Sequence, residues 1–524
     1  MRNNLTMRSI LTFHLFLQLC MQVSAMFYYP TAQTSLLEHI LVDNWDAYAS
    51  NFSSAITPCT NYVTEVGDAA TNSGRTTAAQ WLRVVFHDFI TANVSAGTGG
   101  VDASIGFETF RDENKGSAFN DSFTFWRPFV NEFVPMADLV ALGTVMSVNL
   151  CGGKYIPFRP GRIDASAADP TTGVPEPGTS VEETLEQFER AGFNQVDAIV
   201  LTACGHTLGS VHHGGFPEVS DNSTVSVNNT NGGINFDSSR GVFDPLVVHE
   251  YIDGTGNRGG PLVTSFNVTS RSDLRLYESD GNTTMKTLYT QGDGFLDTCV
   301  DTMSRMINTV PAHVRLQDAV QPISIKPINV TWDINRNGQL ALSGRVRILD
   351  QQVVQSRPIT ITFANGYTKG LTTEDLSGTS AFGVTQFASF SIDRSKIKGS
   401  ASFKIITEGL KTVTFNIQDN YFIIPSLTTV TGSTINVTVA ARKDLKNDGL
   451  TARITVPAVQ PLTLGPRMTS VEIELNQGKT ISSDFEFWQG TSVLEPTTGA
   501  VSVRLLKNEE TLDTLLLDAG IAGW

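Results

Sequence analysis

The sequence has few cysteines, a modest share of charged residues and no long apolar run after its N-terminus. Its 524 residues include five cysteines, and no later segment offers the ~18 consecutive apolar residues that a membrane-spanning helix needs. Lysine and arginine number 37 against 52 aspartates and glutamates, which gives a net charge of −15. Such an acidic balance disfavours nucleic acid and anionic membranes as partners. The sequence therefore predicts a protein that binds neither nucleic acid nor membrane.

The N-terminus has the pattern of a secretory signal peptide. Arg2 and Arg8 precede an apolar stretch over 10–19, and Val23-Ser24-Ala25 has the small-residue form of a cleavage site. The alternative, a membrane anchor, needs a longer apolar run. Export also agrees with the Asn-x-Ser/Thr sequons at Asn51, Asn93, Asn120, Asn222, Asn267, Asn282, Asn329 and Asn436. We expect residues 1–25 to be removed and the chain to be a secreted, extracellular glycoprotein.

The remaining cysteines limit the disulfide pattern without fixing it. Cys20 lies inside the expected signal peptide, so four cysteines remain in the mature chain: Cys59, Cys151, Cys204 and Cys299. Four cysteines allow three pairings, and the residues alone leave all three open.

The chain changes character near residue 315. From about residue 35 to 310, apolar residues recur with helical spacing between loops rich in Gly, Asn and Ser. After about residue 312, short alternating runs and hairpin turns such as 335–338 predict half-buried strands. We expect a mainly α domain over 26–314, followed by an all-β, sandwich-like region over 315–524 that forms one sandwich or two.

A cation and a base share one face of an expected helix. Arg83 and His87 are four residues apart, in Arg83-Val84-Val85-Phe86-His87-Asp88. His87 can move a proton while Arg83 stabilises charge on the atom that leaves. In isolation, such a pair more often belongs to a half-exposed helix with no catalytic role.

Oxygen ligands and a second histidine strengthen the pattern. Asp88, Asp102, the Ser104 hydroxyl and the Gly100 carbonyl form a set that suits Ca²⁺. Farther along, His206 ends the apolar run 197–207, where on its own it would more often be a core histidine.

These motifs, in this order, resemble the plant, fungal and bacterial haem peroxidase superfamily, and within it the secreted fungal peroxidases. The distal motif is matched by Arg83, Phe86, His87 and Asp88, and the proximal motif by 202–207. The resemblance covers residues 35–310 and implies a helical fold with haem b, His206 as the iron ligand and Phe86 beside the haem.

The resemblance also implies the residues around the two histidines. Asn114 is the hydrogen-bond partner that fixes the tautomer of His87, and Glu108 orients Asn114. Asp280 is the acceptor for the other nitrogen of His206, and Glu176 belongs to the loop at the haem edge. A second Ca²⁺ would be held by Thr207, Asp237, Ser239, Val242 and Asp244.

The family chemistry implies that hydrogen peroxide is reduced and that donors are then oxidised by one-electron steps. Manganese-oxidising relatives carry acidic residues where this chain has Thr76, Gln80 and His212, and lignin-attacking relatives carry an exposed tryptophan where it has Leu201. Small phenolic donors at the haem edge remain. Two alternatives stay open, an inactive peroxidase-like scaffold that binds through its β region and a zinc site at His212 and His213.

Two further expectations concern the cysteines and the β region. Among the possible bridges, Cys59 with Cys299 is the first choice, and Cys204 is expected to be a buried small residue. The β region holds none of the matched motifs, so a chain ending near Val314 is expected to fold alone and bind haem. By fold-level analogy alone, the β region would contact a cell wall or polysaccharide.

Overall fold

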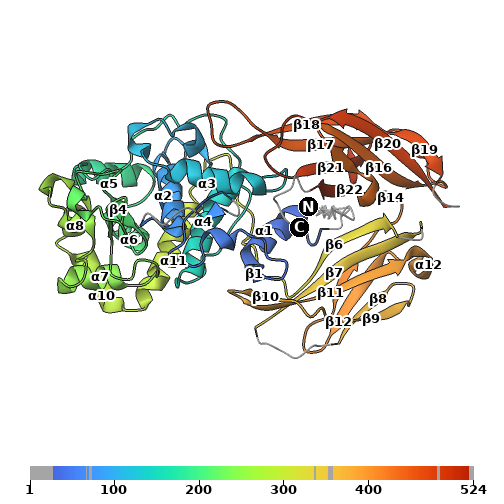
Figure 1. Ribbon diagram of the computed structural model, residues 1–524, viewed down its shortest axis with the longest axis horizontal. Coiled ribbons are helices and arrows are strands. Elements are labelled where there is room, and N and C mark those ends of the chain that lie inside the picture. Colours follow the sequence, from blue (N-terminus) through green and yellow to red (C-terminus); the bar gives the residue numbers. More distant parts are fainter. Residues whose placement is uncertain are drawn as a thin grey trace, which may run out of the picture.

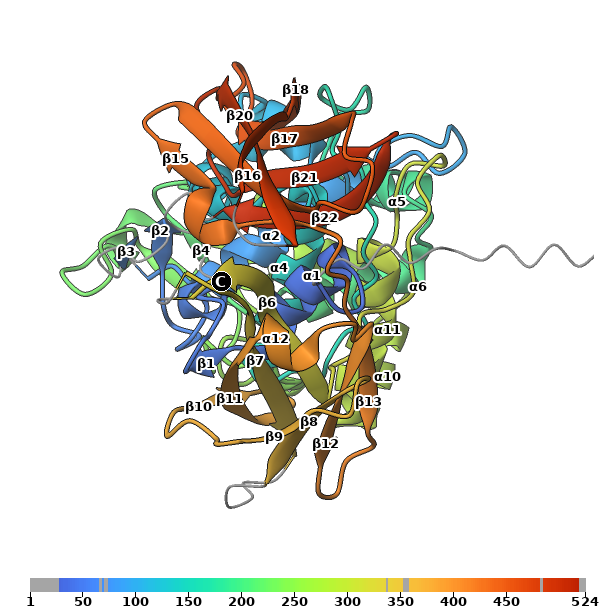
Figure 2. The ribbon, with the colours of Figure 1, turned by 90° about the vertical axis from the view of Figure 1, so that its right-hand side faces the viewer.

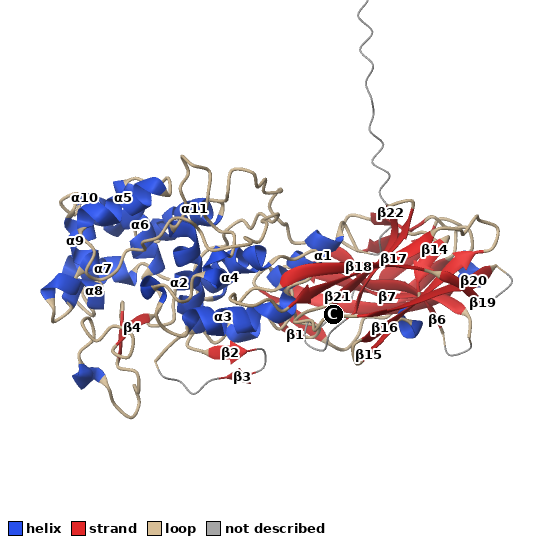
Figure 3. Cartoon of the chain, turned by 90° about the horizontal axis from the view of Figure 1, so that it is seen from above, coloured by secondary structure: helices blue, strands red, loops and turns tan. Residues whose placement is uncertain are grey.

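The computed structural model describes residues 28–65, 68–69, 74–335, 338–351, 358–480 and 484–517. The predicted signal peptide, residues 1–25, lies outside the described residues. Figure 1 shows helices gathered at one end of an elongated molecule and strands at the other, and Figure 3 shows the same division from above. The predicted fold class, a helical domain followed by a β-rich region, is confirmed.

The helical part contains long helices joined by extended loops. In chain order the helices are α1 (Ala32–Val42), α2 (Thr77–Ile90), α3 (Ala118–Trp126), α4 (Met136–Leu150), α5 (Val181–Arg190), α6 (Gln195–Gly205), α7 (Leu246–Asp253), α8 (Pro261–Thr264), α9 (Ser272–Glu278), α10 (Thr283–Gln291) and α11 (Gly294–Ile307). Short strands are β2 (Val63–Glu65), β3 (Asp68–Ala69), β4 (Ser210–His212) and β5 (Gly233–Asn235). Among the described residues, no helix is long and apolar enough to span a membrane.

Local sequence explains where the central helices begin. Asn194 and Asp197 exchange side-chain and backbone hydrogen bonds at the start of α6, a capping box that satisfies otherwise unpaired N–H groups. The α4 sequence is apolar almost throughout, and the helix is correspondingly buried on nearly all sides. The α2 helix packs against α4, which fixes the face that carries Arg83 and His87.

Two disulfides connect the helical part, and neither is the Cys59–Cys299 bridge chosen from sequence. Cys59 is bonded to Cys151 and Cys204 to Cys299. The expected pair is wrong because α6 packs on α11, which brings Cys204 to Cys299, while Cys59 lies beside the end of α4. Cys204 is fully buried, as expected, but it is a bonded half-cystine.

The β-rich part forms two sandwiches, each with its own apolar core. In the first, a sheet of order β1-β10-β11-β7-β6 faces one of order β13-β12-β8-β9. Its strands are β1 (Trp45–Asp46), β6 (Ile325–Ile334), β7 (Leu340–Asp350), β8 (Ile359–Phe363), β9 (Thr368–Leu371), β10 (Ser377–Ser380), β11 (Gly383–Asp393), β12 (Ser402–Thr407) and β13 (Val413–Asn416), with the short helix α12 (Arg394–Ile397).

The second sandwich follows directly along the chain. A sheet of order β14-β16-β20-β19, with β15 beside β16, faces one of order β18-β17-β21-β22. Its strands are β14 (Tyr421–Ile423), β15 (Thr429–Thr431), β16 (Thr434–Arg442), β17 (Leu450–Ala458), β18 (Arg467–Glu474), β19 (Asn476–Thr480), β20 (Phe485–Val493), β21 (Val501–Lys507) and β22 (Glu510–Leu517). Figure 2 shows the two sandwiches side by side against the helical part.

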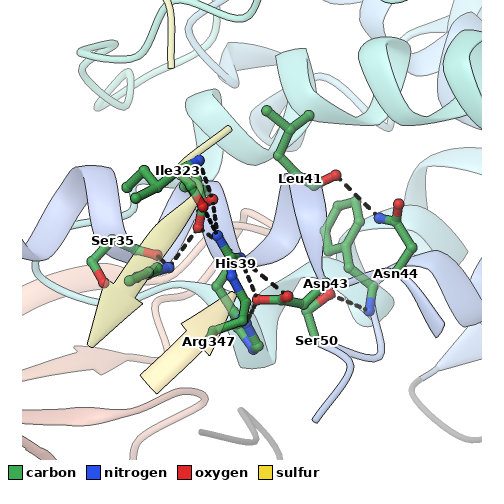
Figure 4. A network of polar contacts seen from close by, with 11 residues as sticks. Ser35, His39, Leu41, Asp43, Asn44, Ser50, Ile323 and Arg347 are labelled. Carbon is green, nitrogen blue, oxygen red and sulfur yellow. Dashed lines mark hydrogen bonds and ion pairs between the residues drawn. The ribbon is translucent and has the colours of Figure 1, made fainter. Parts of the chain in front are cut away.

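A buried ionic network joins α1 to the first sandwich (Figure 4). Glu38 on α1 pairs with Lys326 on β6 at 2.7 Å and with Arg347 on β7, and all three side chains are fully buried. Asp43 also pairs with Arg347, at 3.0 Å. Burial alone would raise the pKa of Asp43, but the Arg347 charge outweighs it and lowers that pKa to about 2. Both carboxylates are thus held in their charged form by cations from the β region.

The N-terminal segment of the helical part also belongs to the first sandwich. Strand β1 adds to the edge of the sheet by pairing with β10, and Tyr29 packs against the sandwich core. In the opposite direction, five apolar side chains from beyond the helices contribute to the helical core: Val320, Leu349, Phe382, Leu464 and Leu516. The helical and β-rich parts therefore share buried surface and charge.

Candidate active site

His87 lies on the cavity-facing side of α2 and is held by one precise contact. The side chain is 8% exposed, and Nδ1 lies 2.7 Å from Oδ1 of Asn114. An amide oxygen can only accept, so this contact assigns the proton to Nδ1 and leaves Nε2 as an acceptor. Burial and the nearby Arg83 charge lower the pKa of His87 to about 3, against a smaller opposing effect of the Asn114 hydrogen bond. The imidazole is therefore a neutral base.

The support of Asn114 differs in one detail from the expectation. The Asn114 amide group donates to the backbone carbonyl of Glu108 at 2.9 Å, whereas the Glu108 carboxylate accepts from the Asp169 N–H at 2.8 Å and pairs with Arg111 at 2.7 Å. The carboxylate was expected to orient Asn114, and that role is wrong. Glu108 instead fixes the loop whose main chain orients Asn114, and Asp169 was not found from sequence because it follows no matched motif.

Arg83 stands one helical turn before His87. Its Nη1 donates to the Lys115 carbonyl at 3.0 Å, while Nη2 is buried and has no hydrogen-bond partner among the described residues. The guanidinium lies over the ring of Phe119 at 5.0 Å, and burial lowers the pKa of Arg83 to about 10. It stays charged at neutral pH and keeps a donor for a small anionic species.

His206 follows α6 directly, and its acid partner is not the one expected. Its Nδ1 lies 2.6 Å from Oδ2 of Asp273 at the start of α9, and its ring stacks on Phe236 with centroids 4.0 Å apart. The assignment of this role to Asp280 is wrong, because Asp280 lies two turns farther along and accepts from the N–H groups of Thr283 and Thr284 at the start of α10. Segments 271–276 and 275–280 both place an aspartate near an arginine and leucines, so sequence gave no basis for the choice.

His87 and His206 line the same cavity. Its volume is about 310 Å³, within the range of small-molecule sites, and its lining is largely apolar. Arg83 and Phe86 line it beside His87, and the Pro175-Glu176-Pro177 loop lies at its rim. With each Nδ1 bonded elsewhere, the two Nε2 atoms are the ones left for chemistry. The sequence-predicted residues Arg83, Phe86, His87, Glu176 and His206 are thus brought together.

The first expected calcium set is assembled as a buried acidic loop. Asp88 accepts from the N–H groups of Asp102, Ala103 and Ile105 at 2.9–3.1 Å and from the Ser104 hydroxyl at 3.3 Å. Burial and then the Asp169 charge raise the pKa of Asp102 to about 7. The expected Gly100 carbonyl has no recorded contact with this group. The raised pKa values indicate excess negative charge that a cation would relieve.

The second expected set holds two unsatisfied oxygen atoms. Thr207 Oγ1 and Asp237 Oδ2 are buried and have no hydrogen-bond partner among the described residues. Asp237 accepts from Ser239 through its other oxygen at 2.7 Å, and the Ser239 hydroxyl also lies 3.3 Å from the Val242 carbonyl. Burial raises the pKa of Asp244. Orphaned buried oxygens fit an oxygen-liganded cation.

Neither loop amounts to a ready-made acidic metal site. Among the described residues, no group of three or more His, Cys, Asp and Glu side chains is arranged to hold a metal ion. Within those residues the zinc alternative at His212 and His213 also finds no ligand cluster. His213 contacts the Ser220 carbonyl and His212 lies 3.2 Å from the Ser210 hydroxyl at the cavity wall.

A helical fold with a cavity between two tethered histidines defines a class of protein. Residues 63–290 match the model of the family described as peroxidase. The helical part of the chain belongs to the haem peroxidase superfamily.

Relatives from fungi and plants agree with this. The chain is 36% identical over 338 residues to a WSC domain-containing protein of Arthroderma benhamiae, covering 63% of this chain and 44% of that protein. It is 37% identical over 142 residues to L-ascorbate peroxidase 5, peroxisomal, of Arabidopsis thaliana, covering 27% and 50%. It is 30% identical over 136 residues to cytochrome c peroxidase, mitochondrial, of Cryptococcus neoformans, covering 25% and 36%. The chain thus spans half or less of these curated relatives.

Proposed function

We propose that this protein is a secreted haem peroxidase that reduces hydrogen peroxide and oxidises small phenolic donors by one-electron steps. One observation carries the proposal, namely that two histidines face a common cavity and each has its Nδ1 fixed by a hydrogen bond. A histidine pair in a packed core would have no reason to leave both Nε2 atoms beside an open cavity. Haem in that cavity would supply the redox chemistry.

The residues of the α6 side would hold the cofactor. His206 would bind iron through Nε2, because its Nδ1 is engaged by Asp273. A carboxylate on the far nitrogen gives the imidazole more anionic character, which favours the more oxidised metal. Phe236 stacks on the ring and keeps it from rotating.

The residues of the α2 side would handle the proton. His87 Nε2 would take the proton from the near oxygen of peroxide and return it to the far oxygen as the O–O bond breaks and water leaves. Arg83 would donate from its free Nη2 to the departing oxygen, on which negative charge develops. The low pKa of His87 keeps this base neutral in acidic surroundings.

The donor proposal follows from what surrounds the cavity. Thr76 and Gln80 line it at the places where a manganese site would need carboxylates, and Leu201 is buried where an exposed tryptophan would be needed. A phenol reaching the rim near Glu176 remains the simplest donor. Two Ca²⁺ ions in the loops of Asp102 and Asp237 would hold the segments beside the two histidines.

Secretion and the outer partner of the β region belong to the same proposal. Two disulfides support an oxidising compartment, as do exposed sequon asparagines such as Asn120 and Asn436. Contact of the β region with a cell wall or polysaccharide stays a prediction.

The test is haem loading followed by a donor screen. Full-length protein made with haem available should show a Soret band and react with peroxide, and the product should oxidise phenols faster than Mn²⁺ or a high-potential aryl ether. His87→Ala should keep the Soret band and react with peroxide about 10²–10⁴-fold more slowly. A chain that takes up no haem would instead support the inactive scaffold.

A further inference from the structure

The second sandwich contacts the segment that holds the distal residues. Thr463, Leu464 and Gly465, in the loop between β17 and β18, form what we call the docking turn. The Leu464 N–H donates to the Gly106 carbonyl at 3.0 Å, and the Leu464 side chain joins the helical core. Gly106 lies in the short 3₁₀ helix η2 (Ser104–Phe107). Residues more than 350 positions apart thus meet through main chain.

The approach at Gly106 is close enough to require glycine. A Cβ at this position would lie 3.1 Å from Thr463 Oγ1, 3.4 Å from the Gly465 nitrogen and 3.0 Å from the Phe123 ring. Contacts this short are tighter than ordinary packing. The docking turn and α3 therefore enclose η2 from two sides.

The η2 segment is the shared support of Asp88 and Asn114. Ile105, beside Gly106, donates its N–H to Asp88 at 3.0 Å, and Asp88 directly follows His87. The Ile105 carbonyl accepts from Glu108 N–H, and the Glu108 carbonyl accepts from the Asn114 amide group. Asn114 then meets His87. A shift of η2 would reach the distal base by two routes.

The docking turn is itself held by contacts of its sandwich with the helical part. Arg504 on β21 pairs with Glu132 at 2.8 Å and lies over the Phe133 ring, and Ser502 also donates to Glu132 at 2.6 Å. At Gly499 the backbone is so close that a Cβ would lie 2.2 Å from the Val130 carbonyl. The loop is thus anchored on both sides of its sheet.

We propose that the docking turn of the second sandwich positions the distal histidine, so that the β region contributes to reactivity with peroxide as well as to stability. The inference rests on the proposed peroxidase function for its catalytic consequence. Its structural part, coupling of the turn to η2, stands on the contacts alone. Leu464 and Thr463 are positioning residues, because they touch neither the cavity nor any reacting group.

The experiment compares Leu464→Ala and Gly106→Ala with Leu462→Ala in the full-length, haem-loaded protein. Leu462 is 94% exposed in the same loop and makes a matched control. Hydrogen exchange of the Ala103 and Ile105 amides, which donate to Asp88, should speed up about tenfold in both test variants and stay unchanged in the control. The rate constant with peroxide should fall about 10–100-fold, as for other outer positioning groups.

Proximal readouts separate positioning from general loosening. Exchange of the Asp197 amide at the start of α6 and the vibrational signature of the His206 bond to iron should match wild type. Adding Thr463→Ala to Gly106→Ala removes one of the crowding atoms and should recover part of the lost rate. Wild-type exchange at Ala103 and Ile105, or equal acceleration at Asp197, would overturn the inference. Failure of the wild-type chain to react with peroxide would reject the proposed function instead, leaving the exchange result to decide the coupling.

Discussion

At the scale of single residues, the site depends on what each histidine does with its Nδ1. On one side the partner is an amide oxygen, which fixes a tautomer and leaves a neutral base. On the other side it is a carboxylate, which strengthens a metal ligand. The same side chain thus has opposite roles because its second nitrogen faces different neighbours.

The pairing of His206 with Asp273 gives a test that needs only isosteric changes. Asp273→Asn should lower activity about 10–100-fold and raise the reduction potential of the haem-loaded protein, because the neutral amide stabilises the oxidised iron less. Asp280→Asn is the matched control and should leave both unchanged, since Asp280 caps α10. Spectroelectrochemical titration of the two variants decides between them, and a shift confined to Asp280→Asn would restore the sequence-based choice.

The pKa of His87 predicts an acid-tolerant reaction. Because burial and Arg83 lower it to about 3, the rate constant with peroxide should stay flat from neutral pH to about pH 4 and fall below about pH 3. The folded chain binds fewer protons than the unfolded chain between pH 6.5 and 3, so this residue lowers stability as the pH falls through that window. Stopped-flow rates against pH measure the first effect. A limb near pH 6.5 would mean that the imidazole is solvated.

Much of the site was accessible from sequence because its groups are local. Arg83, Phe86 and His87 share one face of one helix, and the run ending at His206 is continuous. Asp273 was missed because the choice between two aspartates seven residues apart depends on where α9 begins relative to His206. The docking turn was missed because nothing at Leu464 marks the distant Gly106 as its neighbour.

At the scale of elements, the acidic loop after α2 carries charge that its own protein groups do not balance. Burial raises the pKa of Asp102 to about 7, with the Asp169 charge adding to it, and burial likewise raises that of Glu108 to about 7. The folded loop therefore binds more protons than the unfolded chain from about pH 4 to 7, and its contribution to stability is lost as the pH rises through 7. A bound cation would remove that loss.

Thermal unfolding with and without a chelator tests this. Chelated protein should melt at a lower temperature at pH 8 than at pH 5, and excess Ca²⁺ should remove most of the difference. Asp102→Asn should flatten the pH dependence of the chelated protein, whereas Asp112→Asn, at a side chain 95% exposed, should not. Identical melting curves with chelator and with Ca²⁺ at pH 8 would contradict a calcium-loaded loop.

At the scale of the whole molecule, the two halves are less separable than their sequences indicate. The change from helical to alternating pattern near residue 315 marks a real change of architecture, and it led to the expectation that residues 26–314 fold alone. That expectation took account of covalent order only. Contacts between distant segments, such as Glu38 with Lys326 and Arg347, leave no periodic signature in either partner.

The contacts lead to the opposite outcome for the fragment. Expressed alone, residues 26–314 should be aggregated or free of haem, since they lack the apolar side chains and cations that complete α1 and the helical core. In the full chain, Lys326→Met should cost about 3–5 kcal/mol by leaving Glu38 buried without its partner. Arg467→Met, in a pair with both side chains more than half exposed, should cost at most about 1 kcal/mol. A soluble, haem-binding fragment would show that the halves are independent.

The burial of Glu38 against Arg347 also sets an order of events during synthesis. The two residues are 309 positions apart, so at ~5–20 residues per second the ribosome needs about 15–60 s to make the second after the first. Throughout that interval α1 has no permanent place to dock, and β1 waits longer still for β10. The catalytic half is therefore completed by residues that leave the ribosome after it, and a chain released early would carry every cavity residue without the support that sets them.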